Sequence, residues 1–213
     1  HYLPDEHGNS LSYHNVHALC MDGDDLWIGT YTGGVNVLNT KTGVFRVYTT
    51  KAGDPTTLDR SSSYAIFKDR EARIWVTSMS GVNLYNREED NFTRIRDLGS
   101  WIMDIDQDAD GNIWFSSQGN GLFKYDPDKQ EWTNYVHSSA PGALINDQVN
   151  CVLIDGNGEM WIGTMNGLCK YNAKEDQFEL IPLDIPSRNI CAIIEDQRVL
   201  WLTTTKGLVR YVP

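Results

Sequence analysis

The stretch DGNGEMWIGTMNGLCKY, residues Asp155–Tyr171, contains the pattern that decides the fold. Its centre, MWIGT, has four close copies elsewhere in the chain: LWIGT, IWVTS, IWFSS and LWLTT. Successive tryptophans of the five copies are 48, 39, 47 and 40 residues apart, namely Trp27, Trp75, Trp114, Trp161 and Trp201. A period of about 40–50 residues is typical of propeller blades or solenoid units. The chain is therefore predicted to be a repeat protein.

Each copy extends well beyond its tryptophan. Six or seven residues later a glycine opens a second apolar segment, as in GLCKY from Gly167, and in four copies an aromatic follows at a fixed distance. An alternating apolar and polar segment precedes each tryptophan, separated from it by turn-forming Asp, Gly and Asn. Each copy thus predicts four short strands, which in the fourth copy cover residues 149–154, 160–164, 167–171 and 178–181.

We predict an all-β fold, a β-propeller fragment of four-stranded antiparallel blades, about four to five in number with incomplete ends. One such sheet cannot bury both of its apolar faces, so neighbouring blades must stack, with the repeated tryptophans between them. The whole chain, 1–213, is expected to be a single propeller segment, in which residues 1–15 form the tail of a preceding blade and a linker. The repeats are expected at approximately 16–48, 63–95, 101–135, 149–181 and 190–213, the last without its fourth strand. Since closure takes about four to eight blades, the chain is expected to belong to a longer propeller.

Composition excludes several classes of partner. The 18 Lys and Arg against 29 Asp and Glu give a net charge of −11, which disfavours nucleic acid and anionic membrane. No apolar run approaches the roughly 18 residues needed to cross a bilayer. We therefore expect no nucleic acid and no membrane contact by this segment.

No cofactor or metal is predicted. Cys20, Cys151, Cys169 and Cys191 lack zinc-ligand spacing, and whether they pair is left open. The segment from Asp106 to Ile113 resembles the start of an EF-hand loop, but Ser117 stands where the bidentate glutamate is required. Neither a paired-carboxylate cleft nor a GxSxG motif is visible, so no catalytic residue is proposed.

The pattern from Asp155 to Tyr171, an alternating strand followed by D-x-x-G-x-x-W-I-G-T-x-x-G-L-x-x-Y, resembles the two-component regulator propeller repeat. The resemblance covers nearly the whole chain, although the third copy departs from it with Asp104 and Asp106 in its first strand. It implies the periplasmic sensor region of a hybrid two-component system sensor of gut anaerobic bacteria, anchored in the inner membrane. It also implies an oligosaccharide ligand, control of polysaccharide-utilisation genes, and a histidine kinase outside this chain.

A ligand is expected on the face where the connections into each blade and those after each WIGT segment emerge around the central funnel. The connections from the last strand of one blade to the first strand of the next are alternately long and short. The short connection from Ile95 to Asp104 is expected to leave a notch beside Trp101. Sugar rings stack on aromatic faces, and their hydroxyls bind polar side chains. The candidate ligand-binding residues are Trp101, Tyr64, Arg60, Asn15, His17, Asn150 and Arg188.

Two other functions are compatible with the sequence. A generic protein-protein interaction β-propeller without glycan binding is the alternative, although the Gly-His and Trp-Asp signatures of that class are absent. A propeller lyase or glycosidase would need a clustered catalytic site. The expected partners are an oligosaccharide, the remaining blades of the parent propeller, and a second copy in a possible homodimer joined through exposed apolar edges.

Overall fold

The computed structural model describes residues 1–5 and 8–213, which form strands and turns without an α-helix. Residues 6–7, within the predicted linker 1–15, lie outside the described part of the chain. The chain divides into two compact units, His1–Ile102 (unit 1) and Met103–Pro213 (unit 2). The predicted all-β class and the sheets of antiparallel strands typical of propeller blades are confirmed.

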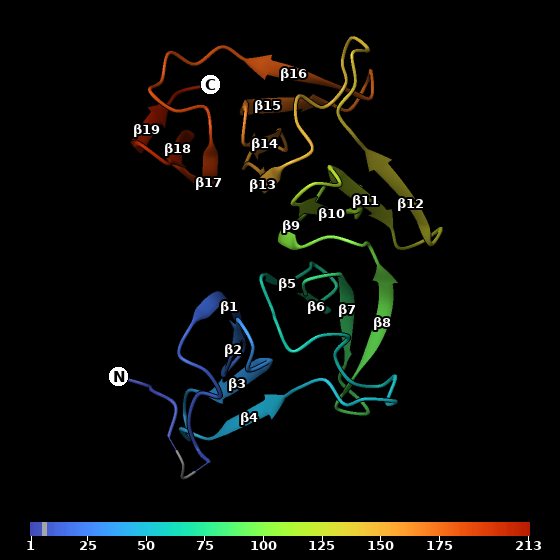
Figure 1. The fold of residues 1–213 in the computed structure, drawn as a ribbon, viewed down its shortest axis with the longest axis vertical. Helices are drawn as coiled ribbons and strands as arrows, with labels where there is room; N and C mark the ends of the chain where they lie inside the picture. The colour runs from blue at the N-terminus through green and yellow to red at the C-terminus, as the bar shows by residue number, and fades with distance from the viewer. Residues whose placement is uncertain (6–7) are drawn as a thin grey trace. The chain divides into compact units, whose positions relative to one another are not determined.

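Unit 1 holds two four-stranded sheets, blue to green in Figure 1. Each sheet is an antiparallel meander, because every strand pairs with the next one along the chain. Blade 1 consists of β1 (Val16–Asp22), β2 (Asp25–Thr30), β3 (Val35–Asn39) and β4 (Phe45–Tyr48). Blade 2 consists of β5 (Ile66–Lys68), β6 (Ile74–Thr77), β7 (Gly81–Asn86) and β8 (Asn91–Asp97).

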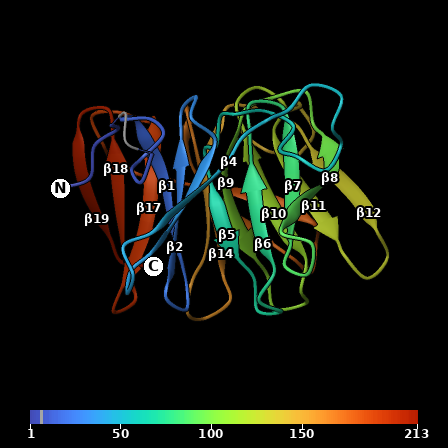
Figure 2. The same cartoon turned by 90° about the horizontal axis from the view of Figure 1, so that it is seen from below.

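Unit 2 holds two four-stranded sheets and one three-stranded sheet, and Figure 2 shows the strands of a sheet standing side by side. Blade 3 consists of β9 (Ile102–Gln107), which starts at the unit boundary, β10 (Ile113–Ser117), β11 (Leu122–Asp126) and β12 (Glu131–Tyr135). Blade 4 consists of β13 (Val149–Ile154), β14 (Met160–Thr164), β15 (Gly167–Asn172) and β16 (Gln177–Ile181). Blade 5 consists of β17 (Ile190–Asp196), β18 (Val199–Thr204) and β19 (Gly207–Tyr211). The four strands predicted for the fourth copy match blade 4 to within one residue.

Three of the repeated tryptophans, Trp27, Trp114 and Trp161, pack between neighbouring blades, as the sequence predicts. In unit 1, Trp27 and Val37 of blade 1 share a core with Ile74, Val76 and Phe92 of blade 2. In unit 2 the face of blade 3 that carries Trp114 meets blade 4, and the face of blade 4 that carries Trp161 meets blade 5. Burial of these large rings between sheets is the main source of stability, since neither sheet could bury both faces alone.

The aspartate six residues before the tryptophan explains the first half of the repeat. In blade 4 one oxygen of Asp155 accepts hydrogen bonds from the backbone N–H groups of Asn157 and Glu159, and so shapes the hairpin turn. Its other oxygen accepts a bond from Trp161 Nε1 at 2.9 Å. Asp69 with Trp75 and Asp108 with Trp114 repeat the arrangement. The carboxylate therefore satisfies a buried indole N–H that would otherwise be costly to desolvate.

Two of the repeated glycines are required by close backbone approach. Gly34 and Gly121 have φ angles of 80° and 78°, a region that favours glycine. A Cβ at either position would also clash with a carbonyl oxygen of the last strand of the same blade, that of Tyr48 or Tyr135. The glycine after the WIGT segment is thus needed for the edge of the sheet to close.

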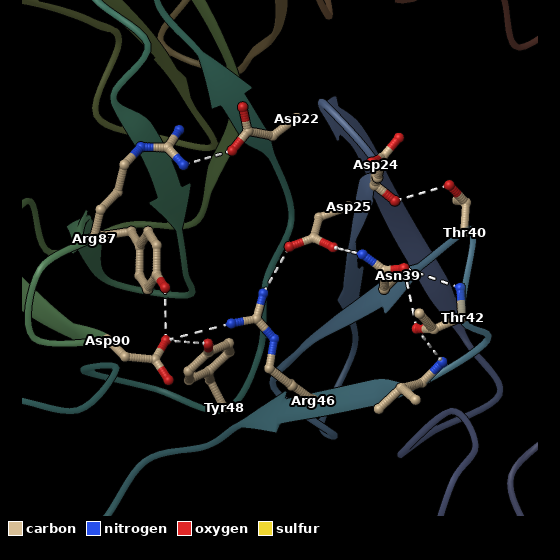
Figure 3. A network of polar contacts seen from close by, with 12 residues as sticks. Asp22, Asp24, Asp25, Asn39, Thr40, Thr42, Arg46, Tyr48, Arg87 and Asp90 are labelled. Carbon is tan, nitrogen blue, oxygen red and sulfur yellow. Dashed lines mark hydrogen bonds and ion pairs between the residues drawn. The ribbon is translucent and has the colours of Figure 1, made fainter.

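A polar network reinforces the contact between blades 1 and 2 (Figure 3). The carboxylate of Asp90, in the hairpin between β7 and β8, accepts hydrogen bonds from the hydroxyls of Tyr48 and Tyr85. Arg46 lies between this carboxylate and Asp25 of blade 1, with a guanidinium nitrogen 2.7 Å from Asp25 Oδ2. The two tyrosine rings also contact Trp27, so the network closes one end of the inter-blade core.

Candidate functional site

Four aromatic side chains of unit 1 form a continuous row, which we call the aromatic row: Tyr31, His17, Tyr64 and Trp101. The Tyr31 and His17 rings are stacked with centroids 5.8 Å apart, and His17 meets Tyr64 edge to face at 5.0 Å. Tyr64 and Trp101 are stacked at 5.6 Å with 17° between their planes. Three of the predicted ligand-binding residues, His17, Tyr64 and Trp101, thus lie together.

Backbone geometry fixes the place of each ring. His17 is the extra residue of a β-bulge, because Val16 pairs with Thr30 while Ala18 pairs with Gly29. Bulges re-aim a side chain and are common near functional sites. Tyr31 directly follows β2, and its N–H donates to the carbonyl oxygen of Asn15 at 3.0 Å.

The other two rings precede the first strands of blades 2 and 3. The residue before Tyr64, Ser63, donates its N–H to the carbonyl of Thr30, and the residue after Trp101, Ile102, donates to the carbonyl of Ser78. These bonds tie the entry of each blade to the strand of the preceding one. Backbone hydrogen bonds therefore fix the positions of the residues that carry the rings of the row.

Three rings of the row are exposed, and Tyr64 is buried. Trp101 and Tyr31 are 41% and 37% exposed, whereas Tyr64 is 7% exposed. The hydroxyl of Tyr64 has no hydrogen-bond partner among the described residues. Burial, followed by the nearby Tyr31, raises the pKa of Tyr64, so the group stays a neutral phenol able to donate or accept. An apolar stacking surface beside an unsatisfied hydroxyl suits a ligand with both ring faces and polar groups.

The other candidate residues lie elsewhere or are otherwise engaged. Asn15 contributes its backbone carbonyl to the position of Tyr31. Arg60 lines a separate pocket of about 400 Å³ in unit 1, beside Arg94, Arg96 and Asp97. In unit 2, Asn150 donates to the side chain of Asn189 and the carbonyl of Ile190 and so links blades 4 and 5, while Arg188 lines another pocket.

Tyr31 is the member of the row that sequence reasoning missed. It stands immediately after LWIGT, where the other copies have Met79, Gln118, Met165 and Thr205. An aromatic in a single copy, on the predicted ligand face, is the signal that could have identified it.

The two aspartates that set blade 3 apart serve to join it to blade 4. Asp104 Oδ2 accepts a hydrogen bond from the N–H of Val152 at 3.1 Å, and Asp106 Oδ2 accepts one from Ile154 at 2.6 Å. β13 is the edge strand of its sheet, so these two N–H groups have no partner strand within blade 4, and the aspartates of blade 3 accept their hydrogen bonds instead. Burial, opposed by the N–H bonds from Val152 and Ile105 and reinforced by Asp106, raises the pKa of Asp104 to about 7.

This pKa predicts a pH-dependent stability. The unfolded Asp104 ionises near pH 3.8 and the folded one near 7, so its contribution is fully present below about pH 4 and is lost as the pH rises through 7. The loss should reach a few kcal/mol, since one pKa unit corresponds to about 1.4 kcal/mol. Urea unfolding at about pH 5 and about pH 8 should show a smaller difference in Asp104→Asn than in the unchanged chain. Parallel pH curves for the two proteins would contradict the assignment.

The loop that resembles an EF-hand is explained by the fold. Asp108 accepts bonds from Trp114 Nε1, from the backbone of Asp110 and from Asn112. Within residues 1–5 and 8–213, no three His, Cys, Asp or Glu side chains gather as a metal site would require. The same residues include no helix long and apolar enough to cross a membrane.

Comparison with known proteins identifies the repeat. The sequence profile of the two component regulator propeller matches residues 10–32 and 143–166. Two segments of the chain are therefore two component regulator propeller repeats. The resemblance predicted from the WIGT pattern is thereby confirmed. The two matched segments contain the first two strands of blades 1 and 4, and the first segment also contains His17 and Tyr31 of the aromatic row.

Three larger proteins are similar to this repeat segment. The extracellular domain of a putative hybrid two component system from B. thetaiotaomicron is 25% identical, with a TM-score of 0.82 over 98% of this chain and 29% of that one. A second such domain from the same organism, 21% identical with a TM-score of 0.79 over 92% and 27% of the two chains, shows the fold alone. Histidine kinase P4 of Formosa agariphila is 29% identical over 181 residues, 80% of this chain and 13% of that protein. The chain thus spans less than a third of each of these relatives.

Proposed function

We propose that this chain is a ligand-sensing propeller segment of a hybrid two-component sensor, placed in the periplasm. Its propeller repeats and its similarity to an extracellular domain of a putative hybrid two component system support this role. In this proposal the parent is anchored in the inner membrane, and its histidine kinase lies in a part of the protein outside these 213 residues. The segment itself is a non-enzymatic binding module.

We infer that the ligand is an oligosaccharide and that it binds at the aromatic row. The observation that carries this inference is the unsatisfied hydroxyl of Tyr64 between the rings of His17 and Trp101. The exposed side of Trp101 offers the apolar surface on which the C–H face of a sugar ring stacks. The Tyr64 hydroxyl is fully covered in this structure, so a sugar hydroxyl can satisfy it where binding moves a neighbouring ring of the row, and that contact removes the cost of a buried unpaired group.

A binding role fits the row better than a catalytic one. None of its four side chains hydrogen-bonds to a carboxylate among the described residues, so no partner is in place to activate a nucleophile or to orient a base. The aromatic row can contribute stacking and hydrogen bonds to a ligand, and these interactions bind a ligand without changing it chemically.

Trp101→Ala is expected to weaken oligosaccharide binding by at least about tenfold, because each factor of ten is about 1.4 kcal/mol, within reach of one lost aromatic contact. Isothermal titration calorimetry with size-defined neutral and acidic oligosaccharides measures this loss. Tyr64→Phe, which removes only the hydroxyl, should weaken binding by a smaller factor. Tyr2→Ala, which removes an exposed ring packed on Phe45 away from the row, is the matched control and should bind normally.

The two alternatives give different results in the same titration. Binding that is equally strong in Trp101→Ala would remove the row as the site. If no oligosaccharide binds, the segment is better described as a protein-interaction propeller, and a hydrolytic or lyase activity would appear as shortened oligosaccharides after incubation.

A further inference from the structure

A pocket of about 420 Å³ lies in unit 2 and shares no lining residue with the aromatic row. It is bounded by the turn that follows β14, by the end of β16, and by the linker from blade 4 to blade 5. Its volume falls in the lower part of the range found for small-molecule sites. Asn166, Leu168, Leu180, Leu183, Ile185 and Arg188 are among its lining residues.

The linker leaves this pocket open because it is not bonded to the turn beside it. In blade 1, Gly34 donates its N–H to the carbonyl of Ser61 in the linker, and in blade 3 Gly119 and Gly121 both donate to the carbonyl of Asp147. No backbone bond of this kind joins residues 182–189 to residues 164–167 in the described chain.

The walls of the pocket are mainly aliphatic. Leu168 is fully buried, and Leu183 and Ile185 pack partly against the core between blades 4 and 5. Leu180 is half-exposed and faces a space that a ligand could fill. These side chains favour an apolar ligand body over one covered with hydroxyls, since a sugar would leave polar groups unpaired against them.

The polar groups of the pocket are free to bind. Arg188 and Asp184 are exposed and make no hydrogen bond or ion pair with a described residue. A guanidinium presents a planar fork of donors that matches a carboxylate in a two-point contact. Asp184 repels an anion, so it sets the limit on how tightly such a ligand can bind.

We propose that this pocket binds a small organic carboxylate with an apolar body, its carboxylate on Arg188 and its body against Leu180, Leu183 and Ile185. The site is independent of the oligosaccharide proposal, because it uses other residues in the other unit. It gives the segment a second binding specificity, for aliphatic or aromatic acids.

Phenylacetate and its neutral isostere phenylacetamide test this proposal directly. In NMR titrations of the isotope-labelled chain at constant ionic strength, phenylacetate should bind saturably in the millimolar range, about tenfold more tightly than phenylacetamide. Arg188→Gln should remove this preference by weakening only the acid. Asp184→Asn should strengthen acid binding about two- to fivefold, because it removes the repulsion.

Arg210→Gln is the matched control, since Arg210 is another exposed arginine of unit 2 and does not line the pocket. It should leave both titrations unchanged. Arg188 is exposed and makes no hydrogen bond or ion pair with a described residue, so its variant should unfold at the same urea concentration as the unchanged chain. Equal binding of acid and amide, absence of saturable binding, or undiminished acid binding in Arg188→Gln would each overturn the proposal.

Discussion

Replacing Trp114 by alanine is expected to lower the free energy of unfolding by about 3–5 kcal/mol, the range measured for loss of a fully buried large aromatic. Its side chain is 0% exposed and lies against the rings of Tyr135 and Tyr171, with centroids 5.6 and 5.1 Å away. Its Nε1 donates to Asp108 Oδ2 at 2.8 Å. The variant therefore leaves a cavity between blades 3 and 4 and removes one hydrogen bond to Asp108 Oδ2, which keeps the bond from Asn112.

Urea unfolding followed by circular dichroism measures the effect, and two variants separate its parts. Trp114→Phe keeps most of the ring but removes the N–H, so it should cost less than alanine, and its cost should not add to that of Asp108→Ala because both remove the same hydrogen bond. Trp101→Ala removes an exposed indole and should cost under about 1 kcal/mol. A Trp114→Ala cost as small as that of Trp101→Ala would show that the repeated tryptophan is not an inter-blade anchor.

The repeated part of the fold was predictable from the sequence because the same physical requirement recurs in each blade. Every sheet needs a turn, a strand that enters the core and a large ring to fill the gap to its neighbour, so the residues that meet these needs return at fixed offsets. The strands of blade 4 could be placed to within one residue for this reason. The Asp155–Trp161 bond belongs to the same pattern, although only the structure shows the contact.

The candidate site was less predictable because it depends on contacts between residues far apart in the chain. Composition and loop length indicated Trp101, Tyr64 and His17, but their contact depends on how the entries of successive blades are bonded to one another. Asn150 shows the opposite case. It occupies the same bulge position as His17, yet its amide bridges to the next blade, and no local pattern distinguishes the two roles.

A second period in the chain became clear only from side-chain contacts. The cluster of Trp27, Tyr48, Tyr85, Phe92 and Asp90 returns as Trp114, Tyr135, Tyr171, Phe178 and Asp176. Corresponding members are 86 or 87 residues apart, which is two blades. Between blades 4 and 5, Ile181 stands where the cluster has Tyr48 or Tyr135, so the interfaces are of two kinds. The alternating lengths of the linkers follow the same two-blade period.

These tyrosine–aspartate clusters predict a marked loss of stability in alkaline solution. Burial, opposed by a bond from Tyr171 and reinforced by the carboxylate of Asp176, raises the pKa of Tyr135 to about 12. Burial and the bond to Asp176 raise the pKa of Tyr171 further, and burial with Asp90 raises those of Tyr48 and Tyr85. In the unfolded chain all four ionise near pH 10, so the folded state holds more protons above that pH. Their contribution is fully present below about pH 10 and is lost as the pH rises through the folded pKa values.

Tyr135 alone should account for about 1–2 kcal/mol of this loss, after allowance for its partial exposure to solvent. Urea midpoints measured from about pH 8 to about pH 11, together with the ultraviolet absorbance of tyrosinate, follow stability and ionisation in the same samples. Tyr135→Phe cannot ionise at that position, so its midpoint should fall less steeply, and Tyr2→Phe, an exposed tyrosine outside the clusters, should follow the unchanged chain. If Tyr135→Phe and Tyr2→Phe lose stability with the same slope, the hydroxyls at the inter-blade carboxylates are not what couples folding to alkaline pH. A shallower slope only in the cluster variants would show that each carboxylate holds neutral phenols from two neighbouring blades together, and that the pair of blades is the unit in which this propeller segment is stabilised.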